Sequence, residues 1–185
     1  VIAAPLLISW VLSPLIAFWI SRTVPAQQTQ LSEAQYRQLR YLARRTWLYF
    51  EQFIGPDDQW LPPDHFQEDP LGIAAHRTSP TNIGLAFLSA LAAYDLGYMG
   101  PLDVMLRLRP TFETMSRMEQ YRGHLLNWYD TRNLRPLPPR YVSTVDSGNL
   151  VGCLLALRQG CLAMPEAAVL CWRRWQGMLD TLGIL

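Results

Sequence analysis

The chain has 185 residues, of which 50% are hydrophobic, and its 16 basic and 15 acidic residues leave a net charge of +1. This length suffices for one domain with its own core, and the near balance of charge argues against nucleic acid as a partner. Neither the three cysteines nor the three histidines have the spacing of a disulfide framework or a metal site, so we predict no bound metal.

The first twenty residues carry no charge. An apolar helix of about 20 residues can cross the roughly 30 Å hydrocarbon layer of a membrane. We therefore predict a transmembrane helix over residues 1–22, with a buried helix of a soluble core as the alternative. The arginines that follow predict, by the positive-inside rule, that the rest of the chain is cytoplasmic.

A polar linker is expected over residues 23–31, and Ser32 is a plausible N-cap for a helix that continues to Phe53. A second helix, opened by a Ser-Pro pair at 79–80 and ending near residue 97, is apolar nearly all round and should be buried. A third, amphipathic helix is predicted over 102–120. The fourth is again apolar and runs to about residue 160, with Asp146 or Ser147 as its cap, and the fifth covers 165–180.

The second and fourth helices resemble each other at their starts, because residues 79–83 (SPTNI) align with residues 146–150 (DSGNL). Repetition at this scale is typical of a toroid of helical hairpins. The fold class expected is therefore all-α: a transmembrane helix, then over residues 32–185 the first hairpins of an incomplete (α/α)6 toroid.

Several motifs resemble the central region of bacterial cyclic β-1,2-glucan synthases. They are residues 45–47 (RTW), 61–68 (LPPDHFQE), 76–85 (HRTSPTNIGL), 123–124 (GH), 127–131 (NWYDT) and 145–150 (VDSGNL). The resemblance covers nearly the whole chain. It places residues 1–22 as the last membrane helix of the glycosyltransferase part, followed by the start of a glycoamylase-like (glucoamylase-like) toroid.

The resemblance implies that this domain acts on linear β-1,2-glucan by transglycosylation, which closes the chain into a ring. It also implies attachment to the bacterial inner membrane through residues 1–20 and contact with the other domains of a parent polypeptide. No cofactor is implied here, and UDP-glucose would serve the transferase part elsewhere. We expect the chain to be an internal piece that is inactive alone. The alternative is a non-catalytic module that holds the nascent glucan for the transferase.

Glycosidase-type chemistry uses two carboxylates, about 5–5.5 Å apart in retaining enzymes and further apart in inverting ones. Asp130 is the predicted catalytic residue, because it follows Trp128 and Tyr129 in a loop that leads to a buried helix. The alternative is a structural aspartate that accepts bonds from backbone amides. The other candidate carboxylates on these loops are Asp64, Glu68, Asp69 and Asp146.

The predicted substrate-binding residues are polar or aromatic side chains on the loops before the two apolar helices. Each has a structural alternative: solvation for the acidic loop at 64–69, bracing of loops for the histidine, arginine and asparagines, helix capping for Asp146, and core packing for the aromatics. The set comprises Asp64, His65, Glu68, His76, Arg77, Asn82, Asn127, Trp128, Tyr129, Asp146 and Asn149.

Overall fold

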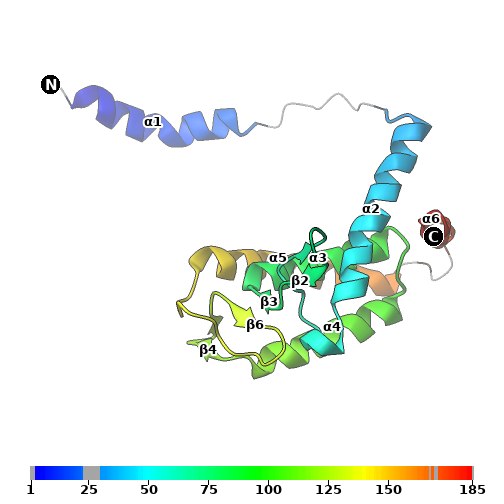
Figure 1. Cartoon of the computed structure of the whole chain (residues 1–185). Helices are drawn as coiled ribbons and strands as arrows, with labels where there is room; N and C mark the ends of the chain where they lie inside the picture. Colours follow the sequence, from blue (N-terminus) through cyan, green and yellow to red (C-terminus); the bar gives the residue numbers. More distant parts are fainter. Residues whose placement is uncertain (1–2, 23–29, 167, 169–170, 185) are drawn as a thin grey trace. The chain divides into compact units, whose positions relative to one another are not determined.

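The computed structural model describes residues 3–22, 30–166, 168 and 171–184. The chain divides into two compact units, residues 1–36 and 37–185, each described here by itself. Figure 1 gives the order of the elements. Most of the predicted linker, residues 23–29, lies outside the described part of the chain.

The first unit contains helix α1, Ala4–Ile20, which continues through Pro14. Its 17 residues rise about 26 Å, which is short of the roughly 30 Å that a hydrocarbon layer requires. Across the described residues, no helix has both the length and the hydrophobicity needed to cross a membrane. The structure therefore does not bear out the transmembrane helix predicted over residues 1–22.

Helix α2, Glu33–Phe53, begins where the sequence predicts. The Gln35 amide donates to Ser32 Oγ at 3.3 Å, and the Ser32 amide donates to Gln35 Oε1 at 2.9 Å. This reciprocal pair is a capping box, which satisfies two amides that the first turn of a helix leaves free. After α2 the chain makes the short 3-10 helix η1, Pro56–Asp58.

Helix α3, Pro80–Asp95, and helix α5, Thr144–Ala163, are the two apolar helices. Ser79 caps α3 as predicted, by accepting from the Asn82 amide. The cap of α5 is Ser143, which accepts from the Asp146 amide, so the prediction of Asp146 or Ser147 as the cap is wrong. The Ser143 hydroxyl bonds to the amide of the third helical residue, which is Asp146. Asp146 therefore has the same position in α5 as Asn82 has in α3.

Helices α3 and α5 pack side by side and run parallel. Near their N-terminal ends, a β-carbon on Gly84 would lie 3.0 Å from the Cys153 sulfur, and near their C-terminal ends Gly160 faces the Leu91 side chain. The absence of side chains at the two glycines lets the helices approach closely. As a result, both N-termini and the loops that precede them lie at the same end of the pair.

Helix α4, Pro101–Arg117, packs on α3 and presents one apolar face to it, as the amphipathic pattern predicts. The predicted fifth helix over 165–180 is instead the 3-10 turn η2, Met164–Glu166, and helix α6, Trp172–Leu182. The α6 backbone comes very close to the turn after α3, because a β-carbon on Gly177 would lie 2.3 Å from the Gly97 carbonyl oxygen.

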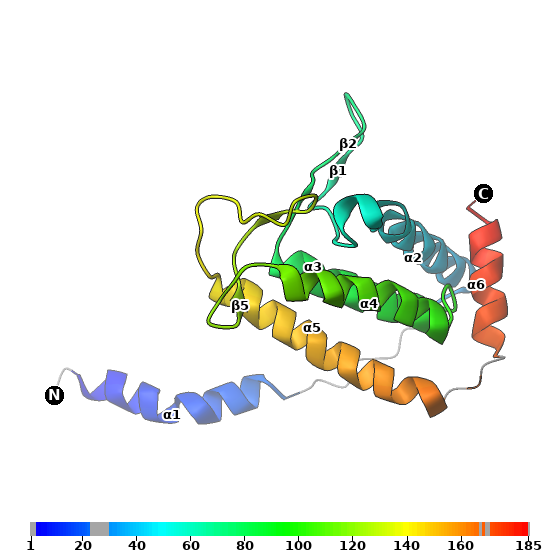
Figure 2. The ribbon, with the colours of Figure 1, turned by 90° about the horizontal axis from the view of Figure 1, so that it is seen from below.

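The long loops contain three antiparallel ladders, each formed by two strands of two residues. The pairs are β1 (Phe66–Gln67) with β2 (Ile73–Ala74), β3 (Arg77–Thr78) with β6 (Tyr129–Asp130), and β4 (Gln120–Tyr121) with β5 (His124–Leu125). The β1–β2 hairpin stands away from α3 and α4 (Figure 2). The β3–β6 ladder joins the two polar segments that the sequence singles out.

The hydrophobic core lies around α3 and includes residues from α2, α4, α5 and the loops. Phe87 and Ile83 of α3, Val104 of α4, Leu61 of the first long loop and Tyr129 of β6 are almost completely buried. Because the loops contribute such residues, their backbone is fixed to the helices. The polar side chains that they carry are held in place by the same packing.

Candidate functional site

The predicted polar residues gather at the shared N-terminal end of α3 and α5. Thr81, in the first turn of α3, donates from its hydroxyl to Asp146 Oδ1 at 2.5 Å, and accepts from Asn149 Nδ2 at 3.1 Å. The two helices are therefore linked by side chains as well as by apolar packing. The predicted mutual bracing of Asn82 and Asn149 takes a different form, because Asn149 bonds to the neighbour of Asn82.

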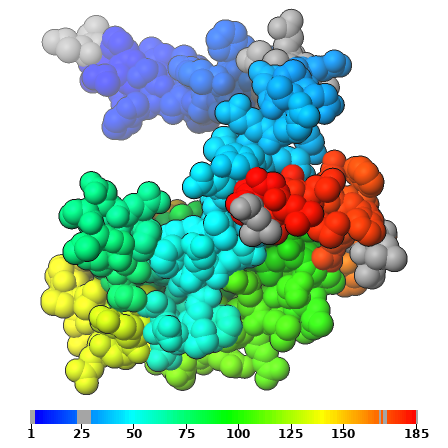
Figure 3. All heavy atoms as spheres, turned by 45° about the vertical axis from the view of Figure 1, so that its right-hand side comes forward, coloured from blue at the N-terminus to red at the C-terminus, as the bar shows by residue number. Residues whose placement is uncertain are grey.

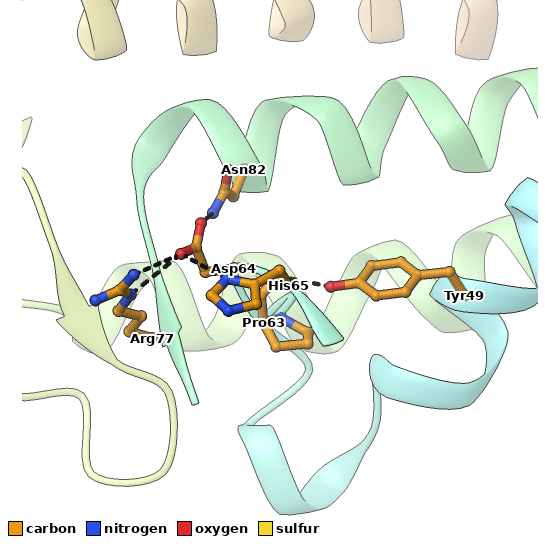
Figure 4. Close-up of polar contacts among 6 residues, drawn as sticks. All are labelled: Tyr49, Pro63, Asp64, His65, Arg77 and Asn82. Atoms are coloured by element: carbon orange, nitrogen blue, oxygen red, sulfur yellow. Dashed lines mark hydrogen bonds and ion pairs between the residues drawn. The ribbon is translucent and has the colours of Figure 1, made fainter. Parts of the chain in front are cut away.

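Asp64 is the centre of the bonds around the start of α3 (Figure 4). Its Oδ2 accepts from Arg77 Nη2 at 2.9 Å and Nε at 3.1 Å, and lies 3.1 Å from His65 Nδ1. Its Oδ1 accepts from Asn82 Nδ2 at 3.3 Å. Four predicted site residues therefore meet at one carboxylate whose side chain is 21% exposed.

The electrostatic balance at Asp64 keeps it ionised. Burial raises the pKa of this carboxyl, but the hydrogen bonds from Arg77, His65 and Asn82 and the charge of Arg77 outweigh burial, so that the pKa lies below its usual value. An ionised carboxylate only accepts hydrogen bonds. Asp64 is thus suited to orient hydroxyl groups rather than to give up a proton.

Asn127 connects the second polar segment to the same end of α5. Its side chain is buried, and with its amide oriented to satisfy its neighbours, the nitrogen donates to Asp146 Oδ2 at 3.2 Å. Its oxygen accepts from the Tyr141 hydroxyl at 2.9 Å and from the Trp128 indole nitrogen at 3.1 Å. Asp146 is consequently held from both sides, by Thr81 and by Asn127, while its carboxylate sits in the first turn of α5, where the helix dipole favours negative charge.

The two aromatic residues beside Asn127 have different environments. Trp128 remains partly exposed, and the Arg77 guanidinium lies 5.2 Å from the centre of its ring. Tyr129 is completely buried; its hydroxyl donates to the Glu119 carbonyl and accepts from the Leu126 amide, both at 2.6 Å. The prediction that Tyr129 offers a stacking surface for a sugar is corrected, since no part of its ring is accessible.

Asp130, the predicted catalytic residue, braces a turn. Its Oδ1 accepts from the Arg132 amide at 2.9 Å and from the Asn133 amide at 3.1 Å. An aspartate that bonds the backbone two and three residues ahead is a common way to close a loop. This contact corresponds to the structural alternative, and a catalytic role for Asp130 stays a prediction.

His76 belongs to a neighbouring cluster that the sequence did not indicate. Its Nδ1 lies 2.8 Å from Oδ1 of Asp58, a buried residue of η1, and the same oxygen accepts from the hydroxyl of the fully buried Thr131. A carboxylate at Nδ1 fixes the orientation of the imidazole ring. His76 therefore serves to tie η1 to the β3–β6 ladder, as the bracing alternative foresaw.

Two of the predicted substrate-binding residues are exposed. The His65 ring is 55% exposed although it contacts Asp64, and Glu68 is exposed in the turn between β1 and β2. The hairpin carries Glu68 away from the helix ends, so the structure does not bring it together with Asp64.

Four residues that bond within these clusters were not predicted from the sequence: Asp58, Thr81, Tyr141 and Ser143. Thr81 and Ser143 had a usable signal, since both stand where a helix begins. Asp58 had none, because only the folded chain brings η1 beside a residue 18 positions downstream.

The cluster combines fixed carboxylates, amide and guanidinium donors and a partly exposed indole. Such a set is chemically suited to a neutral ligand that carries many hydroxyl groups and has an apolar face. Within residues 3–22, 30–166, 168 and 171–184, no three side chains of His, Cys, Asp or Glu gather so as to hold a metal ion.

No protein-family model matches the chain. Over 183 residues, 98% of its length, it is 45% identical to cyclic beta-(1,2)-glucan synthase NdvB of Rhizobium meliloti strain 1021. The chain spans only 6% of the length of that protein.

Two solved structures share the fold. A putative glucoamylase from Bacteroides fragilis matches 86% of the chain and 37% of its own length, with a TM-score of 0.58 and 17% identity. A second, from Bacteroides caccae, matches 79% of the chain and 36% of its own length, with a TM-score of 0.57 and 19% identity. The chain is therefore similar to a short segment of one cyclic beta-(1,2)-glucan synthase, and it shares its fold with part of two putative glucoamylases.

Proposed function

We propose that the chain is part of a domain that acts on linear β-1,2-glucan by transglycosylation and joins a cut chain to its own end as a ring. The observation that carries this proposal is the meeting of the two polar segments, through Thr81, Asp146 and Asn149, at the common N-terminal end of α3 and α5. The similarity to a cyclic glucan synthase supports the choice of substrate.

Within such a domain, the share of this chain is to position the glucan. Asp64 Oδ1 accepts one bond, from Asn82, and a carboxylate oxygen has room for another. A sugar hydroxyl can therefore donate to Asp64 while the Trp128 ring covers an apolar face of the glucose unit. Arg77 contacts both Asp64 and Trp128 and fixes their separation.

One observation favours the second candidate, a module that holds the growing glucan without cutting it. Asp64, Asp130 and Asp146 all accept bonds from neighbouring groups of the chain, which is typical of binding or bracing carboxylates. In that case the chemistry would belong to carboxylates outside these three.

Asp64→Asn in the full protein that carries this chain separates the two functions. Extracts supplied with UDP-glucose are analysed for linear and cyclic β-1,2-glucan. We expect cyclic product to fall roughly tenfold while linear chains accumulate, since a hydrogen bond to a charged group contributes about 1.5–3 kcal/mol. The control is Asp95→Asn, which removes an exposed carboxylate at the opposite end of α3.

A holding module predicts a different product, namely shorter linear chains with an unchanged ratio of rings to chains. If Asp64→Asn yields the same products as Asp95→Asn and the wild type, the cluster does not bind glucan and the proposal is wrong.

A further inference from the structure

A second hollow of about 540 Å³ lies between η1 with the two residues after it and the C-terminal half of α4. Gln59, Trp60, Pro110, Glu113 and Arg117 are among its lining residues. In Figure 3, cyan spheres of the segment around η1 lie against green spheres of α4. None of these residues belongs to the cluster at the ends of α3 and α5.

We propose that this hollow, which we call the Trp60 groove, is a second binding site for β-1,2-glucan, in which Trp60 stacks on a glucose unit. The inference rests on the proposed function, because that function supplies the class of ligand. The groove would hold a stretch of glucan away from the polar cluster.

The backbone at the groove has an unusual conformation. Gln59 and Trp60 both have positive φ angles, 54° and 62°. A bulky residue rarely adopts this left-handed conformation, which persists only where its surroundings enforce it and which is concentrated at binding and active sites. The conformation therefore calls for an account of what Trp60 does there.

The surroundings do enforce it, since every backbone polar group of the two residues is bonded. The Gln59 amide donates to the Pro56 carbonyl at 3.0 Å, and the Trp60 amide donates to the Gly55 carbonyl at 2.8 Å. The hydroxyl of the buried Thr114 donates to the Gln59 carbonyl at 2.7 Å, and that of the buried Thr111 donates to the Trp60 carbonyl at 2.9 Å. The Trp60 backbone is thus held against α4, so that the place from which its side chain projects is set before a ligand binds.

The Gln59 side chain is fixed as well. Its Nε2 donates to the Arg132 carbonyl at 3.0 Å, and its Oε1 accepts from Arg117 Nη2 at 3.0 Å. One wall of the groove is therefore a chain of ordered polar groups. Because Gln59 follows Asp58, the wall is also continuous with the contacts that hold His76 and Thr131.

The walls have the mixed character that a sugar requires. The Trp60 indole is partly exposed and does not belong to the hydrophobic core, and Pro110 adds apolar surface. Glu113 is 61% exposed and binds Arg109 through Oε1, which leaves Oε2 available to accept from a hydroxyl. A flat aromatic face beside charged and amide groups fits a ring that has an apolar face and hydroxyls at its edge.

The test measures the dissociation constant of linear β-1,2-glucan and of sophorose, its disaccharide, by microscale thermophoresis on the full protein that carries this chain. We expect Trp60→Ala to weaken binding of the long glucan roughly three- to tenfold, the range for loss of one aromatic contact. Glu113→Ala, which leaves the Trp60 backbone contacts intact, should weaken it in the same direction and covers the case in which Trp60→Ala does not fold. Trp172→Ala, at a 69% exposed residue of α6, is the matched control.

Unchanged affinity in both Trp60→Ala and Glu113→Ala overturns the Trp60 groove. If those two variants bind normally but Asp64→Asn weakens binding in the same experiment, the Trp60 groove is wrong and the proposed function is still supported. If the wild-type protein binds neither ligand, both the groove and the proposed function are wrong.

Discussion

Asp130 illustrates at the scale of one residue how a bond pattern can separate a structural from a chemical role. Its Oδ1 accepts from two backbone amides, and the side-chain oxygen of asparagine can accept the same two bonds. Asp130→Asn should therefore keep the turn while it removes the charge. The structural role predicts normal ring yield and normal thermal stability, measured by product analysis and by circular dichroism.

Asp130→Ala is the matched variant, because it removes both bonds. It should lower the free energy of unfolding by about 1–2 kcal/mol, the usual cost of losing such contacts. Loss of ring product in Asp130→Asn without loss of stability would instead make the carboxylate catalytic.

Asp64 should make the stability of the protein depend on pH. Its pKa is lowered in the folded state, mainly because hydrogen bonds from Arg77 and its neighbours outweigh the effect of burial. The stabilisation is then complete above the unfolded pKa, near 4, and is lost as the pH falls through the folded value. Urea unfolding should find Asp64→Asn less stable than the wild type at pH 7, with the difference shrinking below about pH 4. A difference that is constant from pH 7 to pH 3 would contradict this account.

The residues of the polar cluster were predictable where a helix start fixes them. Asn82 and Asp146 follow capping positions at the ends of apolar helices, and parallel packing of those helices brings the ends together. Tyr129 was not predictable in the same way, since an aromatic residue in a loop can face a ligand or the core. The packing of distant segments decides between the two, and that information is not local.

At the scale of elements, the start of α5 gives a direct test of capping. Ser143 accepts from the Asp146 amide, whereas Ser147 lies inside the helix. Ser143→Ala should lower the free energy of unfolding by about 1 kcal/mol, and Ser147→Ala should leave it nearly unchanged. Equal effects in chemical denaturation would place the cap elsewhere.

The close approach of α3 and α5 gives a second test. A β-carbon at Gly84 would lie 3.1 Å from the Cys153 β-carbon and 3.4 Å from the Leu150 α-carbon, so Gly84→Ala should push the helices apart. We expect a net loss of up to about 2 kcal/mol, because overpacking costs about 1–3 kcal/mol and the gain in helix propensity offsets about 1 kcal/mol of it. The control, Gly152→Ala, has nothing within 4 Å and should gain about 0.5–1 kcal/mol. A stabilising Gly84→Ala in thermal melts would show that the helices can separate freely.

The existence of the helices was predictable from the periodicity of apolar residues and from the serine, proline and glycine residues near the helix ends. Their exact starts did not, as Ser143 shows, because several polar residues before α5 could each have capped it. The fifth predicted helix failed for a related reason. Pro165 is a good first-turn residue, yet the chain makes only a 3-10 turn there before α6 begins at Trp172.

At the scale of the whole molecule, the chain divides into two compact units, residues 1–36 and 37–185. The core belongs to residues 37–185 and draws on α2 to α5. Removal of residues 1–29 should therefore leave the unfolding temperature of the remainder unchanged in calorimetry. A lower unfolding temperature, compared with the intact chain under the same conditions, would mean that the first unit contributes to the core.

The toroid-like arrangement was predictable because it arises from a repeat that the sequence displays: apolar helix, amphipathic helix, polar loop. The error over residues 1–22 has the opposite origin. Hydrophobic composition alone suggested a membrane helix, but the helix that forms has only 17 residues. The hydrophobic composition of a segment does not say at which residue its helix ends.

The Tyr129 hydroxyl has a consequence for chain entropy. By bonding Glu119 and Leu126, it closes two rings within the long segment between α4 and α5, and the Asn127 amide closes another by donating to the Tyr141 carbonyl at 2.9 Å. The entropic cost of closing a loop grows with its length, so each of these short rings costs less to close than a single ring over the whole segment would. That segment therefore behaves as a set of short, closed turns. A protease requires an extended, accessible stretch of chain. We therefore expect it to cut first at the exposed tip of the β1–β2 hairpin, residues 68–72, and not in the segment between α4 and α5.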